Sequence, residues 1–216
     1  MIKIKMNLHS IITNPFYQNV WIISDETDNS AVLVDPGAEP EKILSFIKIN
    51  ELNPLAILCT HAHPDHISAI SAIQKSFPVP CYIHQDDRQT LETSTILGQM
   101  LGFGEFDLPN NLEWIDREKT LTFGKLEFQV IHTPGHTPGS VCFQIGDSLL
   151  SGDTLFAGSV GRINLPGGSW KLLKESLEKL SALPESLTVY PGHGRQTTIR
   201  EELRSNPYLK RKSVPA

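Results

Sequence analysis

Thr60-His61-Ala62-His63-Pro64-Asp65-His66 directly follows a short apolar run and concentrates three imidazoles and one carboxylate in six residues. The apolar run is typical of a buried strand. Because side chains alternate along extended backbone, His61 and His63 point the same way. Pro64 suits the first turn of a helix, where its missing N–H costs no hydrogen bond. Neutral imidazoles and ionised carboxylates are ligands of zinc and similar transition metals. The stretch therefore predicts a strand–turn–helix unit that carries a metal site.

The composition is typical of a globular protein with a sizeable core. The 216 residues are 39% hydrophobic and 20% charged, which is compatible with one large domain or two small ones. The formal net charge is −5, so the composition does not indicate a basic surface for nucleic acid, and a polybasic face for membranes is not expected either. No apolar run approaches the length of about 18 residues that marks a transmembrane helix.

The N-terminus and the cysteines indicate the compartment. Residues 1–6 alternate apolar and charged side chains and lack the apolar core of a signal peptide. Cys59, Cys81 and Cys142 are too few for a disulfide framework, and each lies in a predicted strand. We expect reduced, buried cysteines and a cytoplasmic protein.

Hydrophobic periodicity predicts strands and then helices, twice along the chain. Strands are expected at residues 2–8, 17–24, 31–34, 55–59, 79–83, 112–115, 120–123, 125–131, 140–145, 148–150 and 187–190. Helices are expected at residues 39–50, from Pro64 to about residue 77, after the N-cap Ser169, and at residues 198–204. The helix after Ser169 is expected to turn Trp170, Leu173, Leu177 and Leu180 inward. This order fits two packed sheets with helices outside them.

Residues 86–112 form the least regular part of the sequence. Gly98, Gly102 and Gly104 interrupt helical propensity, and apolar residues such as Met100 and Phe103 lie between them. An apolar loop of this length can be a substrate lid or a loop that covers core, and the sequence leaves both readings open.

Four predicted strands lead into ligand-type residues. They lead to His61, His63, Asp65 and His66, then to His136, to Asp153 and to His193. In three of the four cases a glycine immediately precedes the ligand-type residue, which lets backbone approach a crowded centre. One zinc takes about four ligands including water. If these strand ends share one edge, seven side chains suit two divalent ions bridged by a carboxylate and a hydroxide. We expect zinc, with iron or manganese as alternatives.

The four motifs T-H-A-H-P-D-H, P-G-H-T-P-G-S, S-G-D-T-L-F and P-G-H-G resemble those of metallo-β-lactamase-fold hydrolases. Within that superfamily the sequence is similar to glyoxalase II-type enzymes, the hydroxyacylglutathione hydrolases, in their short bacterial form. The resemblance implies an α+β fold in one domain over residues 1–216. That fold is a four-layer αββα sandwich of two mixed β-sheets with helices on both outer faces.

The same resemblance assigns roles to the ligand-type residues. It implies that His61, His63 and His136 hold one metal, that Asp65, His66 and His193 hold the second, and that Asp153 bridges them. Two departures from the family pattern are visible. The chain stops soon after its last ligand-type residue, where longer relatives carry a helical domain that grips glutathione, and Asn164 stands where many relatives have Asp.

The expected function is hydrolysis of a thioester such as S-lactoylglutathione by a metal-bridging hydroxide. Asp65 and Asp153 would be catalytic, because their carboxylates orient the hydroxide and neutralise the metals. Arg162 and Arg195 are candidates for substrate binding, although Arg162 can equally tie down the glycine-rich loop. A small molecule, for example a glutathione thioester, is the expected partner, with no role for nucleic acid or membrane.

Three alternatives remain open on the sequence. The first is a persulfide dioxygenase with one iron held by His61, His136 and Asp153. The second is hydrolysis of a lactone or other ester, and the third is a non-catalytic metal-binding protein. His132 is either a hydrogen-bond partner of a ligand or a bystander. His84 is expected in a loop.

Overall fold

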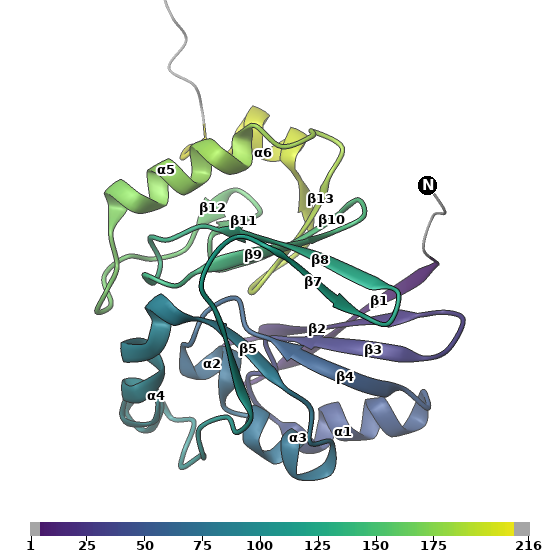
Figure 1. Ribbon diagram of the computed structural model, residues 1–216. Helices are drawn as coiled ribbons and strands as arrows, with labels where there is room; N and C mark the ends of the chain where they lie inside the picture. Colours follow the sequence, from purple (N-terminus) through teal and green to yellow (C-terminus); the bar gives the residue numbers. More distant parts are fainter. Residues whose placement is uncertain (1–4, 210–216) are drawn as a thin grey trace, which may run out of the picture.

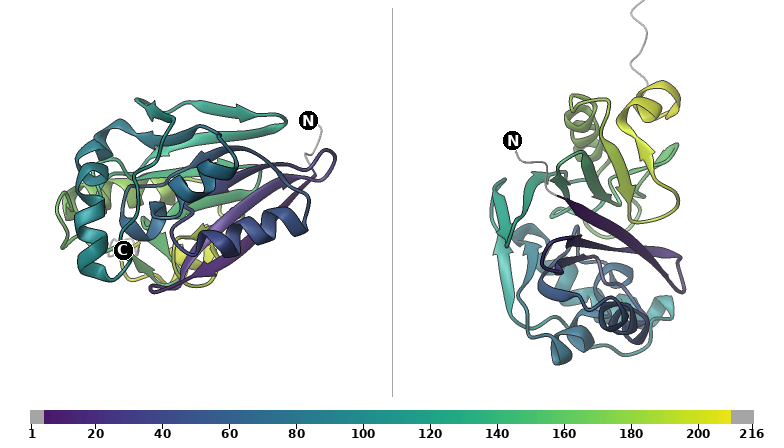
Figure 2. Two further views of the ribbon diagram at one scale, coloured as in Figure 1. Left: turned by 90° about the horizontal axis from the view of Figure 1, so that it is seen from below. Right: turned by 90° about the vertical axis from the view of Figure 1, so that its right-hand side faces the viewer.

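The computed structural model describes residues 5–209 and confirms the four-layer αββα sandwich. Two six-stranded sheets face each other, with α1–α4 outside the first sheet and α5 and α6 outside the second (Figure 1). The right-hand view of Figure 2 shows these two sets of helices at opposite ends of the molecule, with the strands between them. Each sheet thus has one face toward helices and one toward the other sheet, as layered packing requires.

The first sheet has the strand order β1-β2-β3-β4-β5-β6. Its strands are β1 (Met6–Thr13), β2 (Gln18–Asp25), β3 (Ser30–Val34), β4 (Asn53–Leu58), β5 (Cys81–His84) and β6 (Leu112–Ile115). From β3 to β6 the strands are parallel, so each connection must cross over outside the sheet. The crossovers carry α1 (Pro40–Ile49), α2 (Pro64–Ile67), α3 (Ile70–Ser76), a short 3₁₀ helix (Gln85–Asp87) and α4 (Arg88–Leu101).

The second sheet has the order β14-β13-β10-β9-β8-β7. Its strands are β7 (Thr120–Phe123), β8 (Leu126–His132), β9 (Val141–Ile145), β10 (Ser148–Gly152), β13 (Thr188–Pro191) and β14 (Thr197–Thr198). The parallel pair β10 and β13 is joined through the small hairpin β11 (Leu155–Phe156) and β12 (Ser159–Val160) and through α5 (Trp170–Ser181). Helix α6 (Ile199–Ser205) follows the last strand.

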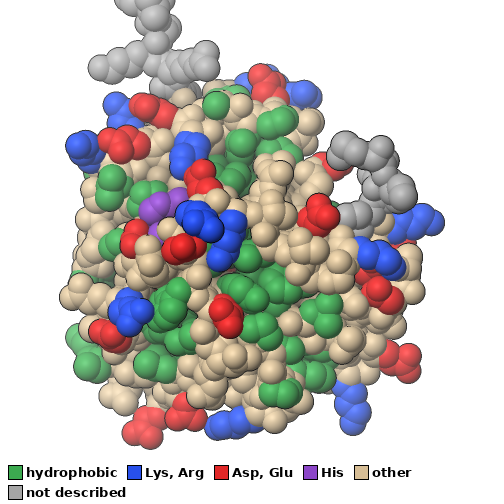
Figure 3. All heavy atoms as spheres, viewed as in Figure 1, with side chains coloured by type: hydrophobic (Ala, Val, Ile, Leu, Met, Phe, Trp, Pro, Cys, Tyr) green, Lys and Arg blue, Asp and Glu red, His purple; other side chains and the backbone are tan. Residues whose placement is uncertain are grey.

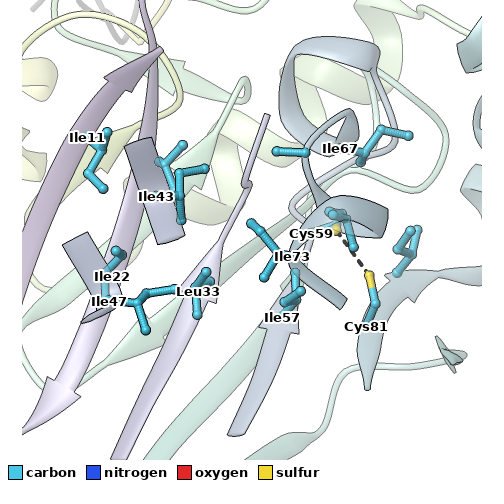
Figure 4. Packing of buried hydrophobic residues seen from close by; sticks show 14 of the residues in the cluster. Ile11, Ile22, Leu33, Ile43, Ile47, Ile57, Cys59, Ile67, Ile73 and Cys81 are labelled. Carbon is cyan, nitrogen blue, oxygen red and sulfur yellow. Dashed lines mark hydrogen bonds between the residues drawn. The ribbon is translucent and has the colours of Figure 1, made fainter. Parts of the chain in front are cut away.

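Three apolar clusters separate the layers. In the first, Ile43 and Ile47 of α1 pack on Ile22 and Leu33 of the first sheet (Figure 4). The second lies between the two sheets and contains the fully buried Phe128, and the third lies under α5 and α6. Successive residues of β2 and β3 enter different clusters, because side chains on a strand alternate between its faces. This explains why all residues of both strands are buried.

Two predicted helical segments differ from the structure. The helix expected from Pro64 to about residue 77 divides into α2 and α3, because the Ala69 N–H leaves the helical pattern and donates to the Pro36 carbonyl. Residues 86–112 are not one irregular loop, since α4 occupies residues 88–101. Gly98 lies inside α4 because a β-carbon there would collide with the ring of Phe106. The absence of a side chain at Gly98 thus lets the Phe106 ring pack against α4. Only residues 102–111 of this segment are irregular.

Smaller differences concern element ends and one aromatic side chain. The first strand begins at Met6, and residues 2–4 of the expected strand lie outside the described residues. Ser169 caps α5 as predicted, and Leu173, Leu177 and Leu180 are buried. Trp170 is 43% exposed, so its predicted inward position is wrong.

The cysteine prediction is confirmed, because Cys59, Cys81 and Cys142 are free and buried. Between residues 5 and 209, no helix combines the length and apolarity that crossing a bilayer requires.

Replacing Phe128 tests whether the contact between the sheets stabilises the fold. Phe128→Ala should lower the free energy of unfolding by about 3–5 kcal/mol, because it removes a buried ring from a layer that cannot fully collapse. Denaturant unfolding of the purified protein measures the effect. Ile49→Ala is the control, since Ile49 is 76% exposed and the change should stay within about 0.5 kcal/mol. Equal losses for the two variants would contradict the prediction.

Candidate metal centre

All seven ligand-type side chains predicted from the sequence meet at one edge of the sandwich. The structure brings together His61, His63, Asp65, His66, His136, Asp153 and His193 in overlapping groups whose ligand atoms lie within 4.8 Å of one another. They come from the turn between β4 and α2, from α2 itself, and from the segments that follow β8, β10 and β13. The strand-end prediction is therefore correct about convergence.

The first group consists of His61, His63 and His136. Their rings stand edge to face, with centroids 4.7–4.8 Å apart. Nδ1 of His63 lies 2.9 Å from Nε2 of His136. All three side chains are buried. Three imidazoles with their nitrogens turned toward one point are a donor set typical of a zinc site.

The second group consists of Asp65, His66 and His193. Oδ2 of Asp65 lies 3.2 Å from Nε2 of His193 and 3.7 Å from Nε2 of His66. His66 is fully buried, whereas His193 is partly exposed. This group is a second set of three donors beside the first.

Asp153 lies between the two groups. Its Oδ2 is 3.5 Å from Nε2 of His136 in the first group. Its Oδ1 is 3.3 Å from Nε2 of His66 and 3.7 Å from Nε2 of His193 in the second. One carboxylate thus reaches both groups with different oxygens, which is the position of a bridging ligand.

Unpartnered polar atoms show that the centre fits cations. Nε2 of His61, Nε2 of His66 and Oδ1 of Asp153 are buried without a hydrogen-bond partner. Such atoms are costly to bury unless something compensates them. A lone pair on each imidazole nitrogen and a charge on the carboxylate are what a divalent ion would engage. The cluster is therefore suited to a dimetal site.

Hydrogen bonds behind three of the rings hold one nitrogen of each imidazole, so that the other nitrogen is turned toward the centre. His61 donates from Nδ1 to Thr60 Oγ1 at 3.1 Å. His136 donates to the Arg162 carbonyl at 2.6 Å, and His193 donates to the Phe16 carbonyl at 3.2 Å. Such partners fix the tautomer and orientation of a ligand imidazole.

Asp35 anchors the early histidine turn and was not predicted as a functional residue. Its carboxylate accepts from the backbone N–H of Thr60 at 2.7 Å, from the Thr60 hydroxyl at 2.7 Å and from Nδ1 of His66 at 2.9 Å. Asp35 has φ 53°, a left-handed conformation that is uncommon for a non-glycine residue and concentrates at functional sites.

Asp87 ties two ligand-bearing turns together and was also missed. It accepts from the Ala62 N–H at 2.8 Å, from the Gly139 N–H at 2.7 Å and from the Thr137 hydroxyl at 2.9 Å. Asp35 follows β3 and Asp87 follows β5, the two parallel neighbours of β4. Since parallel strands end at the same edge, the strand-end argument would have found both if it had been applied to these neighbours.

Two glycines make the close approach possible. A β-carbon on Gly192 would collide with Oδ1 of Asp153 and the ring of His66. A β-carbon on Gly152, which has φ 48°, would collide with Thr60. The glycines that precede these ligand-type residues are thus required by crowding, as expected.

Burial and neighbouring charges set the protonation states. Burial, followed by the neighbouring His136, lowers the pKa of His63 to about 3, and burial also holds the pKa of His61 well below its usual range. Burial opposes ionisation of Asp153, but the nearby His66, His136 and His193 together outweigh it and lower the pKa of Asp153. Near neutral pH these imidazoles are neutral and this carboxylate is ionised, which are the forms that bind metals.

His66 carries the opposite shift. Burial disfavours its charged form, but Asp153, Asp65 and Asp35 together raise its pKa well above the ordinary value. A cation that binds at this ring must therefore displace a proton.

The remaining predicted residues, Arg162 and Arg195, have exposed side chains. The Arg195 side chain is exposed, with Nη1 donating to the Gln196 carbonyl at 3.2 Å. The Arg162 side chain is exposed and only its backbone carbonyl contacts the centre, through His136. Their role in substrate binding stays a prediction, and Asn164 is exposed.

His132 and His84 contact each other instead of a ligand-type residue. His132 donates to the Pro138 carbonyl at 3.0 Å, and its ring stacks on His84 with centroids 4.1 Å apart. His84 is buried at the end of β5, so the prediction of a loop position is wrong.

The sequence is similar to known proteins of one family. A family model described as "Metallo-beta-lactamase superfamily" matches residues 13–193. The chain is 34% identical over 215 residues to "Hydroxyacylglutathione hydrolase GloC" of Haemophilus influenzae, with 96% of this chain and 100% of that protein covered.

Two solved structures are also similar. One is described as the "BLEG-1 B3 metallo-beta-lactamase" and has a TM-score of 0.87, 38% identity, and coverage of 94% of this chain and 99% of that chain. The other is "TTHA1623 in a di-iron-bound form", with a TM-score of 0.85, 39% identity, and coverage of 93% and 100%.

Asp35 provides a test of the centre that alters none of the seven side chains. In Asp35→Asn the NH₂ group takes the place either of Oδ2, where it faces both the Thr60 hydroxyl and the His66 N–H, or of Oδ1, where it faces the Thr60 backbone N–H, so at least one donor loses its acceptor. We expect metal affinity to fall by about 10–100-fold, measured by competition with a chromophoric chelator. Asp107→Asn is the matched control, because Asp107 is exposed and pairs only with Lys75 in the described part of the chain. Unchanged affinity in Asp35→Asn would show that this carboxylate does not position His66.

Proposed function

The chain belongs to the metallo-beta-lactamase superfamily of metal-dependent hydrolases, and from that premise we propose that it is a dinuclear thioester hydrolase. One observation carries the proposal: two complete groups of three donors share the Asp153 carboxylate. In this proposal His61, His63 and His136 would hold one cation, and the other group of Asp65, His66 and His193 would hold the second. Asp153, whose two oxygens reach both groups, would serve both cations.

The cations and the protein have separate tasks. When bound, two divalent cations supply Lewis-acid chemistry, since they polarise a carbonyl and make hydroxide available near neutral pH. The carboxylates of Asp65 and Asp153 accept hydrogen bonds from the attacking water and orient it toward the carbonyl carbon. The buried rings of the first group exclude bulk water from one side of this point, which strengthens the electrostatic interactions there.

The charge state of the centre favours a thiolate leaving group. Asp65 and Asp153 both have lowered pKa values, because the neighbouring histidines, His66 first among them, together outweigh the effect of burial on each, so both carboxylates are ionised near neutral pH. Ionised carboxylates accept protons but do not donate them to a leaving group. A thiol has an ordinary pKa of about 8.5 and departs as a thiolate without an acid, whereas an amine needs a proton. The similarity to a hydroxyacylglutathione hydrolase over the full chain supports the same substrate class.

We propose zinc as the metal and iron as the alternative. Histidine and carboxylate donors suit both ions, and the similar TTHA1623 structure is described as di-iron-bound. We also propose a cytoplasmic location, which the three free, buried cysteines support, because thiols persist in a reducing compartment.

Substitutions at the centre test the function. His63→Ala and Asp153→Ala should each lose bound metal and at least about 1,000-fold of the activity on thioesters, because the first removes a donor from one group of three and the second removes the carboxylate that both groups share. Metal analysis and thiol release from S-lactoylglutathione and from acetyl-N-acetylcysteamine measure the two effects. His9→Ala is the control, since His9 lies on β1 against Phe46 and should keep both properties. Full metal content and unchanged turnover in Asp153→Ala would contradict the proposal.

Metal removal tests the dinuclear assignment. Dialysis against a chelator should abolish thioester hydrolysis, and titration of zinc into the metal-free protein should restore it with two ions per chain. Recovery that is complete at one iron per chain, with oxygen consumed on a persulfide, would favour the mononuclear dioxygenase instead. Release of an amine from a β-lactam at a higher kcat/KM than thiol release would favour a lactamase.

A further inference from the structure

A groove of about 310 Å³ opens beside the candidate metal centre. His63 belongs both to the first donor group and to the wall of the groove. One side of the groove is helix α4, and the other is formed by Pro138 and by Pro166 with Gly167. Its volume is at the lower end of the range for small-molecule sites, which runs from about 300 to 1,000 Å³. Because the two share His63, the groove adjoins the candidate metal centre.

Helix α4 presents an apolar stripe to this groove, formed by Ile96, Leu97 and Met100. The polar side chains of Gln89, Thr90 and Thr93, which come before them in the helix, also line it. Opposite them, Leu91, Ser94 and Gly98 are buried against the rest of the protein. This apolar face is open to solvent, since Ile96 is 64% exposed and Met100 is 78% exposed. Figure 3 shows hydrophobic side chains at the surface in the region of α4. Exposed apolar surface of this kind beside a reactive centre is typical of a ligand groove.

The groove offers no cationic side chain to an anionic ligand. Among the described residues that line it, none is Lys or Arg, and Asp86 is the only carboxylate. Arg162 and Arg195, the arginines that the sequence offered for substrate binding, are not part of the lining. The two carboxylates of a glutathione arm would therefore find no cationic partner among these residues, and only its ammonium group could pair with Asp86.

The same charges decide which half of a thioester the groove holds. A thiolate leaves with a negative charge, and a groove with one carboxylate and no cation does not stabilise that charge. An uncharged acyl chain gains from burial against Leu97, Met100 and the prolines.

We propose that this groove binds the apolar acyl chain of the substrate, and that the protein prefers neutral thioesters with acyl chains of several carbons to glutathione thioesters. This inference rests on the thioester hydrolase function proposed above. The specificity-determining residues are those of α4 that line the groove, above all Leu97 and Met100 of the apolar stripe.

A substrate series tests the preference on the metal-loaded protein. From acetyl- to hexanoyl-N-acetylcysteamine, kcat/KM should rise at least about tenfold, since each buried methylene contributes up to about fourfold. Hexanoyl-N-acetylcysteamine should also exceed S-hexanoylglutathione and S-lactoylglutathione by at least about tenfold. A higher kcat/KM for the glutathione thioesters would overturn the inference and leave the hydrolase function standing. Cleavage of none of the four compounds would overturn both.

A charge placed in the groove supplies the variant test. Met100→Glu should lower kcat/KM for the hexanoyl substrate at least about tenfold, mainly through KM, while the acetyl substrate and the metal content stay unchanged. Gln99→Glu adds the same charge to the neighbouring position of α4, which is exposed and outside the groove, and should leave all three properties unchanged. Equal losses in the two variants would contradict the assignment.

A binding measurement without metal gives an independent readout. The chain has three methionines, Met1, Met6 and Met100. In metal-free protein labelled with ¹³C at the methionine methyl groups, S-hexyl-N-acetylcysteamine should shift the Met100 resonance in a saturable way and leave Met6 unchanged. S-hexylglutathione should shift it less at equal concentration. No shift at Met100, or a larger shift with the glutathione compound, would overturn the proposed groove.

Discussion

The crowding of unpartnered imidazoles and carboxylates at one buried point is the constraint on which the rest of this structure depends. Three buried polar atoms of the centre have no hydrogen-bond partner within the protein, and such atoms oppose folding. The apolar layers on both sides of each sheet must offset that cost. A cation would then bind to donors that folding has already brought together, so the stability of the sandwich is what makes the site available.

The fold brings these groups together because parallel strands end at one edge. Strands β3, β4 and β5 are mutually parallel, and β10 and β13 are parallel in the facing sheet. Two buried carboxylates then hold the turns in place. Asp35 connects the end of β3 to the histidine turn, and Asp87 connects the end of β5 to that turn and to the segment around Gly139. A ring in the centre is therefore oriented by hydrogen bonds that begin on neighbouring strands.

The sequence predicted the donor groups better than their supports, and the reason is physical. His61 to His66 share one local stretch, and the other donors follow strands and glycines that can be recognised one by one. Asp35 acts on Thr60 across 25 positions, and Asp87 acts on Gly139 across 52, so no local pattern records these contacts. The same holds for Gly98. The local sequence suggests that Gly98 interrupts a helix. In the structure it lies inside the helix and against the Phe106 ring, a contact that the local sequence does not record.

Helix α4 shows where selectivity can arise in such a molecule. The donor groups resist change, because Gly192 and Gly152 leave no room for even one additional carbon. The face of α4 that carries Ile96 and Met100 is open to solvent, so substitutions there disturb few packing contacts. Chemistry and substrate choice thus depend on different parts of the chain: the first is fixed by buried, mutually bonded turns, and the second is set by a helix whose outer face is free to vary. In the function proposed above, the metal centre accounts for hydrolysis and the groove beside it accounts for the preference among acyl groups.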